Sequence, residues 1–335
     1  WYGDHRDLHL SIRRQRQMCI RDRTRYKYRG NMTFAFFFFF SLTLSFTITA
    51  ADDCIEIAFY TLGRHYCTAY LCEVLWYTNS CGDGWPKKAK IGADIFGKQL
   101  RDNLVKENIN VDYLEECNGE SGVAFINVFE KTSENQIIVV PGANSYVESS
   151  QVPDELLSST DILISQLEIP PNQIEDLFSR AGNHDCFRIL NAAPTISFEK
   201  NLISETDLLV INELELESLS GYSVDKDNLD SVVIAIESLN LHDSQSVVVT
   251  LGAKGAYVQK GKKDEFMTGH KVSTVDTTGS GDCFIGAMPS SYLEKENLFE
   301  SVHFANQAAA LSTTKQGTSN SMPTKDEVVK FIQTT

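Results

Sequence analysis

The chain has 335 residues, of which 42% are hydrophobic and 22% charged, and its 45 acidic and 30 basic side chains give a net charge of −15. This composition is that of a globular protein with a sizeable core, and it excludes collagen, a coiled coil and wholesale disorder. Binding to a nucleic-acid backbone depends on Lys and Arg, so we expect no nucleic-acid partner for so acidic a chain.

Residues 1–31 differ in charge from the rest of the chain. They contain nine Lys or Arg and three Asp, and they show no hydrophobic period of a helix or a strand. The run MCIRDR over residues 18–23 resembles a translated sequencing adapter, so we interpret the segment as an artefact of library construction. A basic arm for nucleic acid or a targeting signal is the alternative.

An apolar stretch follows over residues 32–51. Taken literally, it predicts a secretory signal peptide, since it is too short and too rich in Ser and Thr for a spanning helix. Translated intron or untranslated sequence is the interpretation that we favour, because the stretch displaces segments discussed below. Residues 52–88 show no clean period, and we leave residues 1–88 unassigned.

Cysteine usage indicates a reducing compartment for the remaining chain. Beyond residue 88 only Cys117, Cys186 and Cys283 occur, without C-x-x-C spacing. This pattern argues against a zinc site and against a disulfide framework. We therefore expect a cytoplasmic protein with no membrane partner.

From about Ala89, strand-like and helix-like segments alternate. An amphipathic helix is predicted over 93–111, followed by a β-hairpin over 121–140. Further apolar strands are predicted at 161–168, 187–194, 207–213 and 246–252, and helices at 171–182, 224–241, from about 283, and at 298–315. The alternation predicts an α/β fold with a mainly parallel central sheet, helices on both of its faces, and one domain over 89–335.

The segment STVDTTGSGDCFIGAM over residues 273–288 is the most informative. Gly279 and Gly281 fall between a strand and a helix, where backbone N–H groups converge and the helix N-terminus adds positive charge. Such an anion hole suits a phosphate whose charge grows in a transition state. Asp282 cannot bind the anion, so it is better explained as a general base. The alternative is a Gly-rich turn with Asp282 as a helix cap.

This segment resembles the carboxy-terminal signature of the PfkB sugar-kinase family. The family's other landmarks follow its order: VINELELESLSG at 210–221, VVVTLGAKGAYV at 247–258 and FANQAAALSTTKQGTSNSMP at 304–323. The resemblance covers about residues 89–331. Within the family, SQLEIP at 165–170 and the final G-x-x-x-S-x-P are most similar to members that phosphorylate D-ribose.

The resemblance implies a carbohydrate kinase that transfers the ATP γ-phosphate to the primary hydroxyl of D-ribose, giving ribose 5-phosphate. Asp282 would deprotonate that hydroxyl and Glu168 would bind another. The anion hole would be formed by Gly279, Ser280 and Gly281. The nucleotide would be held by Asn212, Thr250, Leu251, Gly252, Ala253, Lys254, Gly255, Gly281 and Asn306. Without the resemblance, the sequence of residues 250–255 would predict an ordinary tight hairpin. Asn306 would be interpreted as an amide on a helix surface.

Two metal ions are implied in the same way. Glu215 would organise Mg²⁺ through water, although alone it would pass for a solvated acid at a helix start. The family's ribose-phosphorylating members use K⁺, whose oxygen ligands would come from Asp276, Thr278, Ser312, Lys315, Gly317 and Ser321. Lys315 can contribute only its carbonyl, because its ammonium would repel the ion.

Two departures from the family pattern stand out. The family begins with a sugar-binding strand, a lid strand pair and a G-G-K-G-x-N segment, and the sequence of residues 1–88 has no counterpart. The sugar site would then keep only Glu168 and Asp282, and the central sheet would have an open apolar edge. Pro289, in the helix that follows Asp282, either ends that helix early or is a sequence error.

We therefore expect the chain as written to bind nucleotide weakly and to show no ribose-stimulated turnover. Another PfkB sugar or nucleoside kinase, or a secreted or membrane-associated protein with an inactive kinase fold, is the alternative. The family's lid often pairs two subunits, which leaves a homodimer open; the hairpin at 121–140 would be part of that lid.

Overall fold

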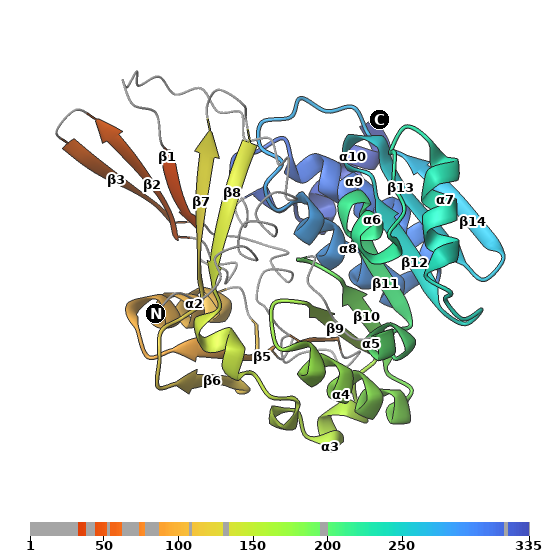
Figure 1. Ribbon diagram of the computed structural model, residues 1–335, viewed down its shortest axis with the longest axis horizontal. Helices are drawn as coiled ribbons and strands as arrows, with labels where there is room; N and C mark the ends of the chain where they lie inside the picture. Colours follow the sequence, from red (N-terminus) through yellow and green to blue (C-terminus); the bar gives the residue numbers. More distant parts are fainter. Residues whose placement is uncertain are drawn as a thin grey trace, which may run out of the picture.

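The computed structural model describes the backbone of residues 33–37, 44–51, 54–61, 74–77, 87–106, 109–129, 134–194, 200–317 and 321–334. These residues form one nine-stranded sheet and one five-stranded sheet, with helices around the larger one (Figure 1). The larger sheet has the order β14-β13-β12-β11-β10-β9-β4-β5-β6. Its strands are β4 (Val74–Tyr77), β5 (Lys87–Gly92), β6 (Leu114–Cys117), β9 (Ile162–Gln166), β10 (Phe187–Asn191), β11 (Leu208–Asn212), β12 (Ser246–Thr250), β13 (Gly255–Lys260) and β14 (Lys263–Thr268).

Helices alternate with these strands along the chain. They are α2 (Ile95–Lys106), α3 (Asp154–Leu157), α4 (Pro171–Ala181), α5 (Lys200–Ser204), α6 (Glu213–Ser220), α7 (Leu229–Ser238), α8 (Ser280–Lys295), α9 (Leu298–Ser312) and α10 (Lys325–Thr334). The sequence analysis did not predict β14 or α10. Neither KDEFMT of β14 nor KDEVVKFIQT of α10 contains a long apolar run. In the structure most residues of β14 are exposed or half-buried, and Val328 is the buried residue of α10.

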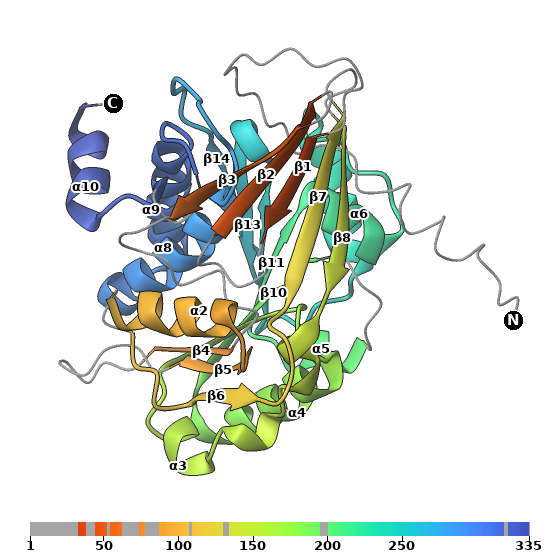
Figure 2. The same ribbon diagram turned by 90° about the vertical axis from the view of Figure 1, so that its left-hand side faces the viewer.

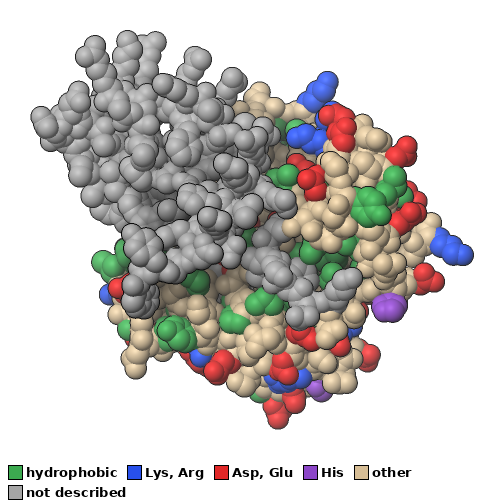
Figure 3. Space-filling view, in the orientation of Figure 1, with side chains coloured by type: hydrophobic (Ala, Val, Ile, Leu, Met, Phe, Trp, Pro, Cys, Tyr) green, Lys and Arg blue, Asp and Glu red, His purple; other side chains and the backbone are tan. Residues whose placement is uncertain are grey.

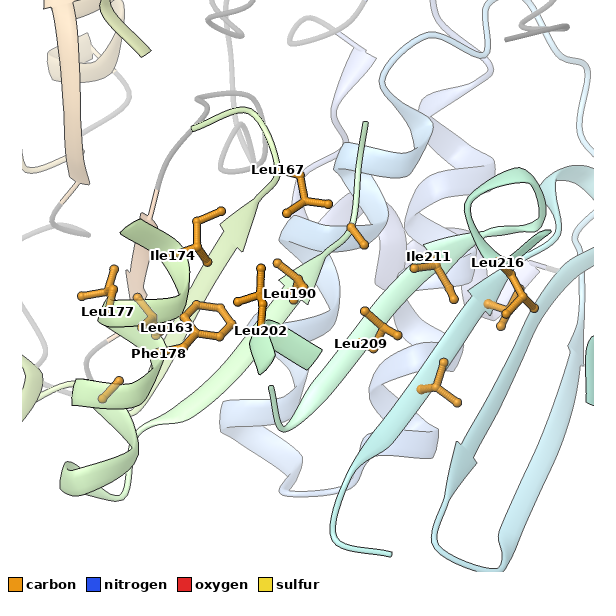
Figure 4. Packing of buried hydrophobic residues seen from close by; sticks show 14 of the residues in the cluster. Leu163, Leu167, Ile174, Leu177, Phe178, Leu190, Leu202, Leu209, Ile211 and Leu216 are labelled. Atoms are coloured by element: carbon orange, nitrogen blue, oxygen red, sulfur yellow. The ribbon is translucent and has the colours of Figure 1, made fainter. Parts of the chain in front are cut away.

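The four central strands, β9 to β12, are parallel and buried on both faces. Alternate side chains of a strand point to opposite faces. Leu209 and Ile211 of β11 accordingly pack with α4 and α7, whereas Leu208 and Val210 pack with α8 and α9. Figure 4 shows the first of these clusters, in which Phe178 of α4 lies among leucines of the sheet. The predicted α/β class, with helices on both faces of a central sheet, is confirmed.

Antiparallel strands flank the parallel centre. On one side β12, β13 and β14 are antiparallel, and on the other β4 pairs antiparallel with both β9 and β5. The expectation that the sheet edge beside β9 is open is therefore wrong. The run VLWY of β4 is too short to show the alternation of apolar and polar residues that identifies a half-buried strand. For this reason the sequence did not predict a strand there.

The five-stranded sheet has the order β3-β2-β1-β7-β8, with all neighbours antiparallel. Its strands are β1 (Thr33–Phe37), β2 (Leu44–Ala51), β3 (Cys54–Thr61), β7 (Val123–Phe129) and β8 (Glu134–Val140). The pair β7–β8 lies where the sequence predicts a hairpin, and most of the apolar stretch 32–51 lies in β1 and β2. In Figure 2 this sheet stands above α2 and β5.

Helix α8 continues through Pro289 to Lys295, so the expectation that this proline ends the helix early is wrong. Pro289 itself is buried. Residues on either side of it, including Met288 before and Leu293 after, pack in or against the cluster that α8 shares with α9 and the sheet. This packing holds the helix together although the proline supplies no backbone donor.

The described surface agrees with the composition of the chain. The described part of the face in Figure 3 carries acidic side chains in many places and no continuous basic patch. Within the described residues, no helix is both long enough and apolar enough to cross a membrane.

The central cluster yields a first prediction. Replacing the fully buried Phe178 by Ala should lower the free energy of unfolding by about 3–5 kcal/mol, because it leaves a cavity between α4 and the sheet. The control Ile234→Ala, at a side chain that is 50% exposed on α7, should change it by about 0.5 kcal/mol or less. Denaturant unfolding measures both, and equal losses would contradict the packing described.

Candidate active site

The carboxyl ends of the parallel strands meet at one edge of the central sheet. Asn212 ends β11 in register with Thr250, which ends β12. Asn191 ends β10 in register with Gln166, which ends β9. Glu168 follows β9 by two residues and is half-buried. The structure therefore brings three of the predicted regions, around Glu168, Asn212 and Thr250, to the same edge, where α/β folds bind their ligands.

Two further polar residues at this edge were not predicted. Gln166 and Asn191 are only 7% and 9% exposed, and each is the last residue of an apolar strand. A polar residue in that position is the signal that could have identified them, because the carboxyl edge is where side chains reach a ligand. Asn191 lies between the strands that carry Glu168 and Asn212.

Asn212 and Glu215 form a reciprocal capping box at the start of α6. The backbone N–H of Asn212 donates to Glu215 Oε2 at 2.8 Å, and the backbone N–H of Glu215 donates to Asn212 Oδ1 at 2.8 Å. The spacing N-x-x-E thus has a local structural cause, since these two side chains satisfy two N–H groups that the helix start leaves without partners. The box holds both side chains in fixed positions at the end of β11.

Glu215 is 6% exposed, so it is not the solvated acid that the sequence alone allowed. Burial raises the pKa of Glu215 to about 7, against the opposing hydrogen bond from Asn212. The negative charges of Glu213 and Asp282 raise this pKa further. Asp282, on α8, is therefore within electrostatic reach of Glu215, on α6. A carboxylate that burial and neighbouring acids destabilise in this way is a favourable partner for a cation.

Asp282 lies in the first turn of α8, directly after the glycines of the predicted anion hole. Gly279 precedes the helix with φ of 79°, a backbone conformation that favours glycine. A Cβ placed on Gly281 would meet no atom within 4 Å, so the space beside its backbone is open. The N–H of Ser280 donates to the carbonyl of Thr277 at 3.2 Å, so in this conformation it is already paired within the chain.

The loop after β12 forms a compact turn. Leu251 N–H donates to the carbonyl of Gly255 at 2.8 Å, and Lys254 N–H donates to that of Leu251 at 3.1 Å, around the 3-10 turn η4 (Gly252–Lys254). The Thr250 hydroxyl donates to the carbonyl of Ile211 at 3.4 Å. The ammonium of Lys254 pairs with Asp227, in the segment before α7. These contacts place the predicted nucleotide loop, which includes Ala253, beside the end of β11.

Asn306 is 7% exposed on α9, which excludes the helix-surface amide that the sequence alone allowed. Its Nδ2 donates to the carbonyl of Thr268 at 3.1 Å. The side chain thereby links α9 to the end of β14. Thr268 pairs with Gly255 across the β13–β14 ladder, and the N–H of Gly269 donates to the carbonyl of Lys254 at 2.7 Å, so Asn306 is attached directly beside the loop at 250–255.

The two predicted cation loops are hydrogen-bonded to each other. Asp276 Oδ2 accepts the N–H of Gly317 at 3.0 Å, and Asp276 Oδ1 accepts that of Thr278 at 2.9 Å. The carbonyl of Thr313 accepts the N–H groups of Val275 at 2.7 Å and Asp276 at 3.1 Å. The loop before α8 and the loop after α9 are thus held together by an aspartate and by main-chain bonds.

Lys315, in the second of these loops, directs its charge away from the other. Its Nζ donates to Glu327 Oε1 on α10 at 3.0 Å. Ser312 and Ser321 are each 1% exposed, and the Ser312 hydroxyl donates to the carbonyl of Ala309 at 2.8 Å. Because Glu327 engages the ammonium, the carbonyl is the part of Lys315 that an ion between the loops could meet.

The donor sets fit the two implied ions in different ways. Among the described residues, no group of three or more His, Cys, Asp or Glu side chains could hold a metal ion. Mg²⁺ usually keeps several waters and is bound through one or two carboxylates together with substrate phosphates. Glu215, buried and close to Asp282, fits a single carboxylate that acts through water. The loops of Asp276 and Gly317 offer carbonyl and hydroxyl oxygens around one net negative charge, which suits K⁺.

The raised pKa of Glu215 predicts how stability depends on pH. The folded chain holds a proton on Glu215 up to about pH 7, whereas the unfolded chain loses it near the ordinary value of 4.5. Stability from this group is therefore full below the lower value and is lost as the pH rises through the higher one. Without divalent metal, raising the pH from 6 to 8 should cost about 1 kcal/mol through this residue.

Glu215→Gln keeps the acceptor for Asn212 N–H and removes the titration, so it should abolish that part of the pH slope. The control Glu237→Gln, at an exposed acid on α7, should leave the slope unchanged. Urea unfolding at pH 6 and pH 8 in the presence of a chelator measures both. A variant at Glu215 with the slope of the unmodified chain would show that this carboxyl is not buried as described.

The chain is similar to known sugar kinases over most of its length. A sequence model of the pfkB family of carbohydrate kinases matches residues 89–325. A ribokinase from Haemophilus influenzae is 33% identical over 246 residues, which cover 72% of this chain and 79% of that protein. A deoxyribokinase from Salmonella typhi is 30% identical over 250 residues, which cover 72% and 80%.

Solved structures show the same relationship. The ribokinase from Thermotoga maritima has a TM-score of 0.64 and 30% identity, covering 74% of this chain and 81% of that one. A ribokinase from Arabidopsis thaliana complexed with ribose and ATP has a TM-score of 0.70 at 24% identity, covering 85% and 91%, and shows the shared fold. With the family match and the sequence identities taken together, the chain belongs to the pfkB family of carbohydrate kinases and is an ATP-dependent sugar kinase.

Proposed function

We propose that the kinase domain of this chain, when joined to an amino-terminal sugar-binding segment of the family, transfers the γ-phosphate of ATP to the primary hydroxyl of D-ribose. The observation that carries the proposal is the position of Asp282, in the first turn of α8 beside the open backbone of Gly281 and within electrostatic reach of the buried Glu215. A base, an anion site and an acid suited to a cation are what phosphoryl transfer needs at one place.

The sugar is proposed from the relatives. The protein from Haemophilus influenzae is a ribokinase, and SQLEIP places Glu168 after β9 at the carboxyl edge. The deoxyribokinase relative makes 2-deoxyribose the second candidate. Both sugars have a primary hydroxyl, so they would share the same chemistry and differ at one ring position.

Asp282 would take the proton of the primary hydroxyl as its oxygen attacks the γ-phosphorus. The bond to the β-phosphate bridging oxygen would break, and ADP would leave. The backbone of Gly281 and the N-terminus of α8 would stabilise the charge that grows on the transferred group. Mg²⁺ would neutralise phosphate charge when it is bound with ATP, and Glu215 would hold its water. The oxygens of the Asp276 and Gly317 loops would hold K⁺.

The nucleotide would lie along the turn at 250–255, with Asn212 near its phosphates and Asn306 near adenine. The hairpin β7–β8 would act as part of a lid over the sugar. Residues 1–88 have no sequence counterpart to the family's first sugar-binding segments, so we propose that the sugar site of this chain is incomplete. No disulfide joins Cys117, Cys186 or Cys283, the cysteines whose side chains are described, and we propose a cytoplasmic location.

The role of Asp282 can be tested in a chimaera whose residues 1–88 are replaced by the amino-terminal segment of the Haemophilus influenzae ribokinase. Asp282→Asn should lower turnover with ribose by about 10²–10⁴-fold, the range for loss of a general base, with little change in ATP affinity. A coupled assay for ADP and calorimetric ATP titration measure the two effects. Turnover within a few-fold of the parent chimaera would remove Asp282 from the role of base.

The unmodified chain, which keeps its own residues 1–88, gives a second prediction. It should produce no more ADP with ribose than without it, because ribose lacks most of its hydrogen-bond partners and the site cannot exclude water. The chimaera should show ribose-dependent ADP production, and 2-deoxyribose in its place tests the second candidate. Robust phosphorylation of ribose by the unmodified chain would mean that residues 1–88 contain a sugar site.

A further inference from the structure

The hairpin β7–β8 joins the body of the molecule at two crossing points. Residues 119–122 lead into β7, and residues 141–144 lead out of β8. In Figures 1 and 2 both strands rise from the side of α2 and β5. The contacts at these crossing points therefore decide how the hairpin is attached.

The first crossing point is fixed by one aspartate. Asp94, just before α2, accepts hydrogen bonds on Oδ1 from Gly97 N–H at 2.7 Å and from the Ser121 hydroxyl at 2.8 Å. Its Oδ2 accepts the N–H of Ser121 at 2.7 Å. Ser121 Oγ in turn accepts the N–H of Gly92, the last residue of β5, at 3.1 Å. Asp94 and Ser121, here called the lid anchor, thus connect β5, α2 and the start of the hairpin.

The lid anchor is buried and charged. Ser121 is 2% exposed and Asp94 is half-buried. Burial alone would raise the pKa of Asp94, but the hydrogen bonds from Gly97 and Ser121 outweigh it and hold the pKa below its usual value. Asp94 is therefore ionised at neutral pH, and its hydrogen bonds are of the stronger, charge-assisted kind.

The second crossing point packs directly on the first. Ala143 N–H donates to the carbonyl of Glu120 at 2.9 Å, in the 3-10 turn η1 (Gly142–Tyr146). Gly142 has φ of 53°, and a Cβ on it would lie 2.6 Å from the carbonyl oxygen of Glu120 and 2.7 Å from Gly122 N. The two crossing points are thus in contact, and whatever holds Ser121 also holds the end of β8.

We propose that Asp94 is a positioning residue for sugar phosphorylation, which fixes the base of the hairpin β7–β8 to β5 and α2 through Ser121. The base of the hairpin is thereby held in one orientation relative to β5 and α2. The assignment of a lid role rests on the proposed function. The attachment itself rests only on the contacts above.

Hydrogen–deuterium exchange on the full chain tests the attachment. Asp94→Asn replaces one of the two carboxylate oxygens by an NH₂ group, which cannot accept a hydrogen bond from the backbone N–H of Gly97 or Ser121. Backbone amide exchange should therefore become about ten-fold faster or more in peptides covering 119–129 and 134–144. Peptides of β9 to β12 should be unchanged. The control Asp102→Asn, at an exposed acid on the same helix, should match the unmodified chain. Faster exchange confined to residues 92–97, with the hairpin unchanged, would overturn the proposal.

Ser121→Ala covers the case in which Asp94→Asn does not fold. It removes the hydroxyl but keeps the Ser121 N–H bond to Asp94, so the same peptides should exchange faster by a smaller factor. If amide exchange throughout the hairpin were unchanged in Ser121→Ala, this result would also contradict the proposal that the lid anchor attaches the hairpin.

The chimaera described above tests the functional part. A loosened lid admits water to the γ-phosphate and weakens sugar binding, so Asp94→Asn should raise the ratio of ADP to ribose phosphate and the KM for ribose several-fold, with the KM for ATP little changed. A uniform fall in all rates, with that ratio unchanged, would reduce Asp94 to a stability role. If the parent chimaera phosphorylates no ribose, the proposed function fails, while hydrogen exchange still decides on the lid anchor.

Discussion

The common direction of four buried strands is the constraint on which the rest of the molecule depends. Because β9 to β12 are parallel and covered on both faces, their carboxyl ends form one edge, and the turns that follow them must begin there. Asn212 and Thr250 end β11 and β12, and Glu168 and Glu215 follow β9 and β11. Apolar packing along the strands thus determines where the polar groups meet.

Short-range hydrogen bonds then orient the groups that the sheet brings together. The capping box of α6 holds Glu215 in a buried position, where Asp282 adds to the cost of its charge. Asp276 holds the loop before α8 against the loop after α9, and Glu327 holds the ammonium of Lys315 outside that pair of loops. Asp94 accepts two hydrogen bonds from Ser121 and so holds the base of the hairpin beside the start of α2. The bonds of Glu215 are local, whereas Asp276 and Asp94 each accept from donors that lie far away in the sequence and so connect two distant segments.

Much of this could be predicted from the sequence, for identifiable reasons. The central strands are mostly apolar runs of five residues that alternate with helices, so their positions along the chain and the mainly parallel class of the sheet could be predicted. Asp282 and the glycines before it were recognisable because two glycines lie at a helix start, although the strand expected directly before them does not form: residues 269–279 are irregular between β14 and α8. What escaped prediction depends on tertiary contact. The burial of Glu215 and Asn306, the pairing of β4 with β9 and the continuation of α8 through Pro289 all arise from packing by distant segments.

The proposed binding of magnesium with ATP depends on the buried Glu215, which lies within electrostatic reach of Asp282. A carboxyl-carbon NMR titration of Glu215, with ¹³C-labelled glutamate and Glu215→Gln for assignment, tests this most directly. We expect the pKa of Glu215 to be about 7 without ligand. We expect this pKa to fall by at least one unit when MgATP is added, because a nearby cation favours the charged form. A pKa near 4.5 in the free chain, or one that MgATP does not move, would contradict the proposed role of Glu215.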